Sequence, residues 1–245
     1  GFAWLRFPAP LEGRFLADTA ASRLRTLLIQ GLPQVCGLDR SGSQTEQLPE
    51  SLVGVEKPAG RIEGRYSPGK RPNAPIALIL HPHPKAGGHM NNPVAVTLHQ
   101  LFVQRGFATL RYNSRGVGKS QGEFDSGIGE LADAATALDW LQANNPGASQ
   151  TWVAGYQFGA YIGMQLLMRR PEITSYVSIS PPANLYDFNF LAPCPNEGLI
   201  VQGDADHLHA ASALAVGEAL QFGYFIDART APAGPGVDQH RPAEQ

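Results

Sequence analysis

The stretch Trp152-Val153-Ala154-Gly155-Tyr156-Gln157-Phe158-Gly159-Ala160 decides the fold. A short apolar run leads directly into a sharp turn, in which glycines stand two residues before and two residues after Gln157. A helical segment follows at residues 159–170 and stops at Pro171. Glycines at this spacing permit the strained backbone of a nucleophile elbow, the strand-to-helix turn that pushes a central side chain out over the N-terminus of the next helix.

The central residue of this elbow is Gln157, where nucleophilic chemistry requires Ser, Cys or Asp. A carboxamide has no ionisable proton and its nitrogen lone pair is delocalised, so no adjacent base can make it a nucleophile. The sequence therefore excludes covalent acyl transfer through this position.

Strands and helices alternate on both sides of the elbow from residue 52 onward. We predict strands at residues 53–55, 61–66, 76–80, 107–112, 151–154, 176–179, 199–201 and 224–226, and helices at residues 93–104, 131–144, 159–170 and 210–222. The run Ile76–Leu80 is apolar throughout, as expected for a strand covered on both faces. The alternation predicts an α/β fold with a mostly parallel, twisted sheet and helices on both faces.

The first 50 residues do not share this pattern. Their aromatic residues Phe2, Trp4, Phe7 and Phe15 follow no sustained period, and we predict an N-terminal arm over residues 1–50. These four side chains are candidate anchors for a partner protein, and an arm folded back on its own domain is the alternative. We assign residues 51–245 to one domain, with an irregular Pro/Gly-rich tail at residues 230–245.

Composition limits the classes of function. The 245 residues are 43% hydrophobic, which is enough for a substantial core, but only 16% charged, against roughly 25% in ordinary soluble domains. This deficit suggests surface that is buried against something else. A net charge of -2 disfavours nucleic acid, because phosphate binding needs a concentrated basic excess.

Cysteine content and hydropathy bear on location. The two cysteines, Cys36 and Cys194, cannot make a disulfide framework and favour an intracellular protein. A mitochondrial location stays open. No apolar run approaches the ~20 residues that a transmembrane helix needs, so we predict no membrane span.

The loop after residues 76–80 is the first candidate for chemistry, since ligands bind beyond the carboxyl ends of parallel strands. Gly87 and Gly88 let backbone N–H groups approach a ligand, which suits an oxyanion hole. His81, His83 and His89 could instead be metal ligands. No Cys or carboxylate completes such a site at usable spacing, so we predict no metal and no cofactor. The structural alternative is that His81 and His83 are hydrogen-bonded loop residues.

Two residues late in the chain and a Gly-Lys-Ser motif are further candidates for chemistry. Asp206 follows the strand at residues 199–201, where the acid of a catalytic triad would orient a histidine. His240 is the only histidine late enough in the chain for the order nucleophile, acid, histidine.

Gly-Lys-Ser at residues 118–120 is typical of a phosphate loop. However, Asn113 stands where that motif needs its first glycine, and no helical pattern follows, so we predict a tight surface loop.

Taken together, these residues resemble the α/β-hydrolase superfamily, and more specifically a group of small bacterial-type hydrolases with little or no lid domain. The resemblance spans about residues 52–228 and is carried, in order, by His81-Pro82-His83-Pro84, Gly87-Gly88, Met90-Asn91-Asn92, residues 111–118, residues 120–125, Gly155-Tyr156-Gln157-Phe158-Gly159-Ala160, Tyr186-Asp187-Phe188 and Gly203-Asp204-Ala205-Asp206.

The resemblance implies an α/β-hydrolase fold without a large lid. It also implies an oxyanion loop with His83, Pro84, Gly87 and Gly88, together with vestigial triad positions at Gln157, Asp206 and His240. Members of the group have Ser where this chain has Gln157. We also expect the family's final helix to be missing after His240, because Arg241 and Pro242 follow and the sequence ends at Gln245.

Our leading hypothesis is a catalytically inactive hydrolase-like protein that serves as a structural or accessory subunit of a larger protein assembly. One alternative is a weak or atypical ester or thioester hydrolase in which His240 and Asp206 activate water. Another is a ligand-binding pseudoenzyme with Gln157 as a hydrogen-bonding floor.

Overall fold

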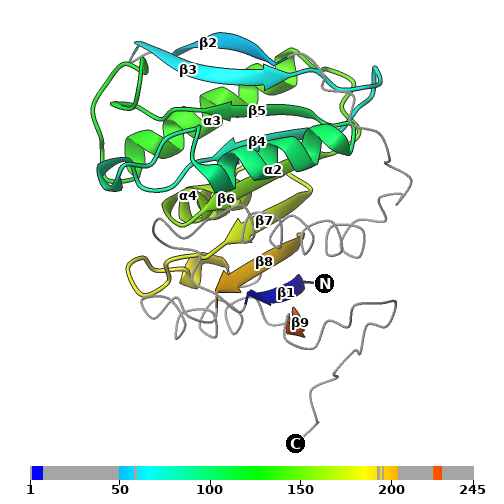
Figure 1. Cartoon of the computed structure of the whole chain (residues 1–245), viewed down its shortest axis with the longest axis vertical. Helices are drawn as coiled ribbons and strands as arrows, with labels where there is room; N and C mark the ends of the chain where they lie inside the picture. The colour runs from blue at the N-terminus through cyan, green and yellow to red at the C-terminus, as the bar shows by residue number, and fades with distance from the viewer. Residues whose placement is uncertain are drawn as a thin grey trace, which may run out of the picture.

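Nine strands of the described chain form one sheet. The computed structural model describes residues 2–7, 50–57, 60–191, 194, 196–203 and 223–227. Its strands are β1 (Phe2–Phe7), β2 (Ser51–Lys57), β3 (Gly60–Ser67), β4 (Ile76–Leu80), β5 (Ala108–Tyr112), β6 (Thr151–Tyr156), β7 (Ser175–Ile179), β8 (Glu197–Gly203) and β9 (Gly223–Asp227). They lie side by side in the order β2-β3-β5-β4-β6-β7-β8-β1-β9 (Figure 1).

The sheet is mostly parallel, as predicted. Only the pairs β2–β3 and β3–β5 are antiparallel among the described strands, and all other neighbours run in the same direction. Parallel neighbours place their carboxyl ends at one edge of the sheet, which is where the candidate loops lie.

Three α-helices of the described chain cover the two faces of the sheet. Figure 1 shows α2 (Pro93–Gln104) in front of the sheet, and α3 (Ile128–Ala143) and α4 (Phe158–Arg169) behind it. Two short 3₁₀ turns, η1 (Pro84–Ala86) and η2 (Asn189–Leu191), complete the described helical segments. None of the helices in the described part of the chain has both the length and the apolar character to cross a membrane. The predicted helix at residues 210–222 and the tail at residues 230–245 lie outside the described residues.

The helix starts follow from local hydrogen bonds. The side chain of Asn92 accepts from the N–H of Val94 at 3.0 Å, and Pro93 at the first position needs no acceptor, so α2 begins where the sequence predicts. We predicted that the next helix starts at Leu131, but α3 begins at Ile128. Its extra turn is held by Glu130, whose two carboxylate oxygens accept from the N–H groups of Asp125 and Gly127 at 2.9 and 2.7 Å.

The core lies between the sheet and these helices. Every residue of β4, β5 and β6 is buried, which explains why these strands carry no alternating pattern. On the α2 side, the rings of Phe102, Phe107 and Trp152 pack edge to face with centroids 5.0–5.8 Å apart. Side chains of this size contribute about 1.5–3 kcal/mol each when they are fully buried.

A buried ion cluster ties β2 to α3 and to the loop after β5. The carboxylate of Asp133, which is 0% exposed, lies 2.6 Å from Lys57 Nζ and 2.8 Å from an Arg115 guanidinium nitrogen. It also accepts from the N–H of Arg115 at 2.8 Å. These donors compensate a carboxylate that could not otherwise be buried in charged form.

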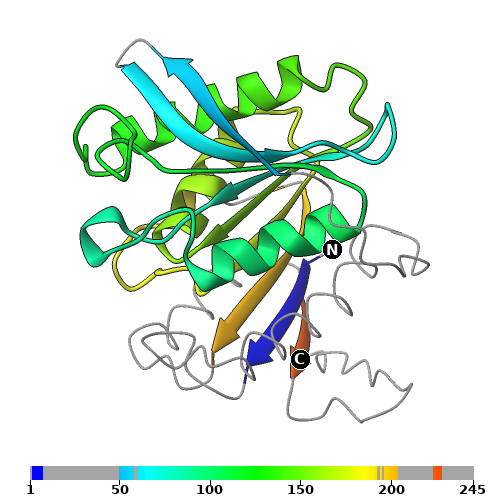
Figure 2. The same cartoon turned by 45° about the horizontal axis from the view of Figure 1, so that its top comes forward.

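Residues 2–7, at the start of the predicted arm, form a strand of the sheet. β1 pairs in parallel with β8 on one side and with β9 on the other (Figure 2). An interior parallel strand shows no period of two, so the pattern of Phe2, Trp4 and Phe7 gave no strand signal. Phe15 and the rest of the predicted arm before residue 50 lie outside the described residues.

Candidate functional site

The turn between β6 and α4 has the backbone of a nucleophile elbow. Gln157 adopts φ 50° and ψ −116°, a strained conformation for any residue other than glycine. Its N–H donates to the carbonyl of Ile179 at 2.9 Å, and its carbonyl accepts from Ala160 at 2.9 Å at the start of α4. The side chain is half-buried at the carboxyl edge of the sheet.

The two glycines of the elbow are required by close backbone contacts. A Cβ on Gly155 would collide with the carbonyl of Gly159. A Cβ on Gly159 would lie 2.5 Å from the carbonyl oxygens of both Leu80 and His81, at the end of β4. The elbow therefore sits directly against the beginning of the loop that was predicted to form the oxyanion hole.

That loop is a compact turn closed by its own hydrogen bonds. The carbonyl of His83 accepts from Ala86 and Gly88 at 3.0 Å, and Gly87 adopts φ 79° after η1. A Cβ on Gly88 would collide with the Pro82 carbonyl, so this position requires glycine. The predicted loop residues His83, Pro84, Gly87 and Gly88 are thus brought together beside the elbow.

Backbone donors remain available at this junction. Among the described residues, no acceptor takes the N–H of His83 in the loop or the N–H of Phe158 at the start of α4. N–H groups from a loop and from the residue after the nucleophile position are the donors that stabilise an oxyanion in this kind of elbow.

His83 presents a donor as well. Its Nδ1 accepts from the N–H of Lys85 at 3.1 Å, which leaves the ring proton of the neutral imidazole on Nε2. Partial burial lowers the pKa of His83, and the nearby Glu130 carboxylate opposes this shift. The neutral ring is therefore the form that prevails at pH 7.

His81 has a structural role. Its Nε2 lies 3.0 Å from both the N–H and the Oγ of Ser114, and its Nδ1 lies 2.6 Å from the carbonyl of Pro82. Desolvation lowers the pKa of His81 to about 4, so the ring is neutral and fully engaged. No group of three metal-ligating side chains forms within the described residues.

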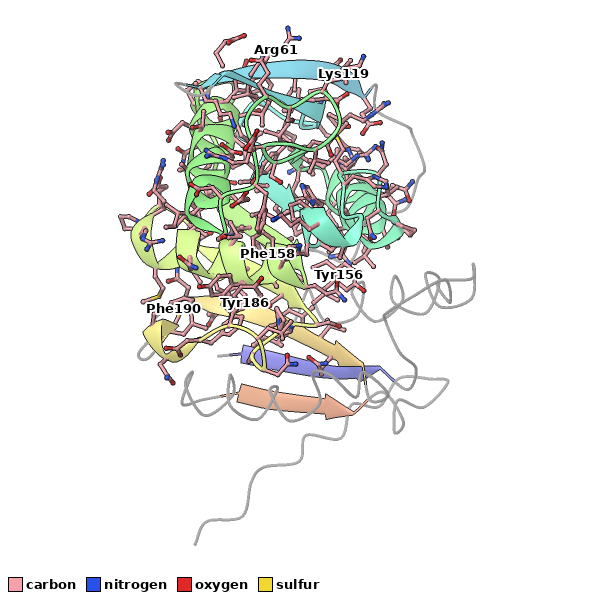
Figure 3. All side chains as sticks on the ribbon, turned by 90° about the vertical axis from the view of Figure 1, so that its left-hand side faces the viewer. Arg61, Lys119, Tyr156, Phe158, Tyr186 and Phe190 are labelled. Atoms are coloured by element: carbon pink, nitrogen blue, oxygen red, sulfur yellow. The ribbon has the colours of Figure 1, made fainter. Side chains whose placement is uncertain are left out.

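Aromatic rings surround the elbow, which the sequence analysis did not foresee. The His83 ring lies 4.8 Å from Phe158 and 4.9 Å from Phe124. The Phe158 ring lies 5.7 Å from that of Tyr186, and Figure 3 labels both of these side chains. Tyr161 stacks on Tyr186 at 4.4 Å. These rings come from four separate segments, so no spacing in the sequence connects them. They give the junction an apolar wall beside its hydrogen-bond donors.

The loop with Gly-Lys-Ser is filled by the chain's own carboxylate. Glu63 Oε2 accepts from the N–H of Lys119 at 3.0 Å and from Asn113 Nδ2 at 2.9 Å. The turn is also held by Ser120, whose Oγ donates to the Asn113 carbonyl at 2.7 Å. Because a carboxylate already occupies the amide donors that a phosphate would need, the structure supports the surface-loop interpretation.

Two of the three predicted triad positions cannot be placed. Asp206 and His240 lie outside the described residues, so their positions relative to Gln157 stay predictions. Phe2, Trp4 and Phe7 lie on β1, whose backbone is paired on both sides. Their role as partner anchors is likewise a prediction.

Comparison with known proteins agrees with this geometry. Residues 64–220 match the family described as X-Pro dipeptidyl-peptidase (S15 family). An uncharacterized protein of Rickettsia prowazekii is 57% identical over 157 residues, which cover 63% of this chain and 66% of that protein. The chain thus spans slightly less than two thirds of the length of this curated relative.

Solved structures give the same answer. A protein of unknown function from Agrobacterium tumefaciens, described as an α/β hydrolase, is 55% identical with a TM-score of 0.68; the match covers 73% of this chain and 83% of that one. An α-β serine hydrolase homologue from Coxiella burnetii is 31% identical with a TM-score of 0.66, covering 76% and 90% of the two chains. A serine hydrolase without lid from Xanthomonas campestris is 28% identical with a TM-score of 0.64, covering 76% and 86%.

The elbow, the adjoining loop, the strand order and these matches lead to one assignment: the chain belongs to the α/β-hydrolase superfamily, in the X-Pro dipeptidyl-peptidase (S15) family.

Proposed function

We propose that this chain is a catalytically inactive α/β-hydrolase-fold protein that serves as an accessory subunit of a larger protein assembly. The observation that carries the proposal is Gln157, which occupies the strained central position of the elbow with φ 50°. A carboxamide at that position cannot attack a carbonyl carbon, because it offers neither a proton to a base nor a localised lone pair.

The contacts around Gln157 support the view that this chain keeps the hydrolase fold without the hydrolase reaction. Gly155 and Gly159 keep their close contacts, and the loop from His83 to Gly88 keeps its hydrogen bonds. Loss of one triad member alone reduces the rate by several orders of magnitude and leaves only binding and oxyanion effects.

Two properties of the chain support the subunit role. Charged residues make up only 16% of the sequence. Large apolar side chains are also exposed on the described part of the surface, namely Leu52, Ile128, Met168 and Leu185. Ile128 is 78% exposed and Leu185 68% exposed, and burial of either against a partner would be favoured by about 25 cal/mol per Å² of apolar surface.

The absence of acyl chemistry is tested with a fluorophosphonate probe and a panel of short acyl esters and thioesters. We compare the wild type with Gln157→Ala and Gln157→Ser. The expected result is no labelling, and no turnover above the rate without protein, for both wild type and Gln157→Ala. Turnover by the wild type above the rate without protein, or an adduct on any wild-type side chain, would overturn the proposal. Gln157→Ser reports whether the remaining triad positions still work together.

The subunit role is tested by the mass of the native particle, purified from its source without detergent or high salt. We expect a particle well above the 26.3 kDa of the chain, with other proteins in fixed ratio. Recovery only as a monomer argues against the role.

A second candidate is a hydrolase in which His240 and Asp206 activate water. It is favoured by the N–H groups of His83 and Phe158, which have no acceptor among the described residues. This candidate requires ester turnover that is lost in His240→Ala and unchanged in Gln157→Ala, whereas the proposal expects no turnover in any of these proteins.

A further inference from the structure

Two arginines stand directly opposite each other on neighbouring strands of the sheet. Arg65 of β3 is the register partner of Arg111 of β5, so the two side chains share one face. Like charges in directly opposite positions destabilise a pair of strands. The Arg111 side chain is only 7% exposed, so salt and water screen this repulsion little. The arrangement therefore requires a negative group between the two guanidinium groups.

Glu50 supplies that negative group. Its Oε1 accepts from Arg111 Nε at 2.9 Å and lies 2.8 Å from Arg111 Nη2, and its Oε2 lies 3.3 Å from Arg65 Nη1. No other carboxylate in the described part of the chain pairs with either arginine. Glu50 thus places one negative charge between two positive charges.

The surplus remains when the other charges on this face are counted. Glu56 stands opposite Arg61 in the pairing register, and Glu63 accepts from the N–H of Lys119 beside both of these cations. These two carboxylates therefore balance the two cations near them. The site of Glu50 keeps its own surplus of one positive charge.

His99 of α2 closes the site without adding charge. Its Nε2 lies 3.5 Å from Glu50 Oε1 and 3.1 Å from Ser67 Oγ. Burial lowers the pKa of His99 to about 4; Arg111 and Arg65 act in the same direction, and Glu50 opposes them. The ring is therefore neutral at pH 7 and can donate or accept a hydrogen bond there, according to its tautomer.

The carboxylate of Glu50 leaves donors of the site unused. Two nitrogens of Arg111 converge on one carboxylate oxygen, although the edge of a guanidinium group matches two acceptor oxygens. Arg65 Nε is buried and has no hydrogen-bond partner among the described residues. Buried donors without acceptors cost free energy, so an anion with more oxygens would satisfy this site better than a carboxylate does.

Glu50 can leave the site without unpairing the sheet. It stands just before Ser51, the first residue of β2 in the pairing register with β3. The side chain of Glu50 is 27% exposed and that of Arg65 is 39% exposed, so solvent reaches both partners of this ion pair. A dissolved anion can therefore reach the same position.

We infer that Arg65, Arg111 and His99 form a binding site for a phosphate monoester, and that Glu50 is the intramolecular competitor which the phosphate displaces. A phosphate monoester carries a charge of about −1.5 to −2 at pH 7 and has three terminal oxygens. It therefore neutralises both arginines, whereas Glu50 neutralises one. Its additional oxygens provide acceptors for the unused N–H groups of Arg65 and Arg111. This site does not depend on the proposed subunit role.

Isothermal titration calorimetry of the full chain with glycerol 3-phosphate tests the site. Glu50→Gln removes the competitor, and Glu50→Gln/Arg65→Gln also removes one cation. We expect Glu50→Gln to bind the phosphate at least tenfold more tightly than the wild type, and the double variant to bind it at least tenfold more weakly than Glu50→Gln. Acetate, which has one charge and two oxygens, is expected to bind Glu50→Gln at least tenfold more weakly than the phosphate.

Matched controls change a neighbouring exposed charge by the same substitution. Glu56→Gln is expected to bind like the wild type, and Glu50→Gln/Arg61→Gln is expected to bind like Glu50→Gln. Circular dichroism verifies that the variants fold. If Glu50→Gln does not fold, thermal unfolding gives a second test: glycerol 3-phosphate should raise the melting temperature of the wild type and of Arg61→Gln, but not that of Arg65→Gln.

Three outcomes overturn the inference. They are equal phosphate affinity of the wild type and Glu50→Gln, equal effects of the Arg61 and Arg65 substitutions, and equal affinity for acetate and phosphate. The peptide Ac-Gly-Gly-pSer-Gly-Gly-NH2 identifies the source of the phosphate. Binding tighter than that of glycerol 3-phosphate indicates a phosphorylated protein segment, and equal or weaker binding indicates a small-molecule ester.

Discussion

Gly159→Ala adds one carbon at the point where α4 meets β4. The new Cβ would lie 2.5 Å from the carbonyl oxygens of Leu80 and His81 and 2.7 Å from the carbonyl carbon of Leu80. Ordinary van der Waals contact begins at 3.4 Å, so the overlap is about 0.9 Å. All three neighbours are backbone atoms of β4 or of the residue after it, and none can rotate away.

The expected loss of stability follows from this overlap. Either α4 moves about 0.9 Å from the sheet or β4 is distorted, and a gap of 0.5–1 Å forfeits a quarter to a half of each dispersion contact. Overpacking in a core costs typically about 1–3 kcal/mol, and a backbone collision belongs at the upper end. Replacing glycine by alanine stabilises a helix by up to about 1 kcal/mol, which offsets part of this cost. We expect a net loss of about 2 kcal/mol in the free energy of unfolding.

The matched control is Gly163→Ala, one turn further along the same helix. Its new Cβ would lie 3.2 Å from Val153 Cγ2 and 3.7 Å from Leu80 Cδ1, which are side-chain atoms that can shift. The same gain in helix propensity then leaves this variant as stable as the wild type or slightly more stable. Urea unfolding followed by circular dichroism compares the two variants. With a slope of about 2 kcal/mol per molar urea, the midpoint of Gly159→Ala falls by about 1 M.

A midpoint for Gly159→Ala at or above that of Gly163→Ala would refute the reasoning. It would mean that α4 does not approach β4 as closely as the elbow geometry requires, and that the half-buried position of Gln157 is not fixed by these two glycines.

Two further predictions concern buried charge. Asp133→Ala leaves Lys57 and Arg115 without their carboxylate, and we expect the free energy of unfolding in urea to fall by about 3–5 kcal/mol. The control Asp139→Ala removes a 61%-exposed partner of Arg170 and should change that free energy by less than about 1 kcal/mol. Equal losses in the two variants would contradict the assignment of Asp133 as a buried ion-pair partner. Desolvation lowers the pKa of His81 and of His99 to about 4, whereas a histidine in the unfolded chain has a pKa of roughly 6.5. The unfolded state therefore binds more protons between these two values, and the free energy of unfolding falls as the pH drops from roughly 6.5 toward about 4. Between pH 7 and 5 each histidine contributes on the order of 2 kcal/mol to this loss of stability. His99→Gln should therefore lose less stability than the wild type when urea unfolding at pH 7 and pH 5 is compared. Equal losses in the two proteins would assign the pH dependence to other groups.

Much of the fold could be predicted from the sequence because its signals are local. The apolar runs of β4 and β6, the capping residue Asn92 and the glycines of the elbow each specify their own segment. The helix at residues 93–104 was predicted with its observed bounds. The predicted start of α3 was three residues too late. The first turn is held by hydrogen bonds from the N–H groups of Asp125 and Gly127 to the Glu130 carboxylate, and the spacing of apolar residues does not report such bonds.

The site could be predicted only in part. The spacing of Gly155, Gln157 and Gly159 identified the elbow, and Gly87 and Gly88 identified the adjoining loop. The ring contacts of His83, Phe158 and Tyr186 depend on how distant segments come together, so no local pattern contains them. The placement of β1 between β8 and β9 was missed for the same reason.

The position of β1 has a consequence for synthesis of the protein on the ribosome. Its partner β8 begins at Gly198 in the paired register, 191 residues after Phe7, and β9 follows later still. At 5–20 residues per second, translation takes roughly 10–40 s to reach that partner. β1 therefore waits through this interval for its neighbours, and during it both of its backbone edges are open to chaperones or to pairing with another nascent chain.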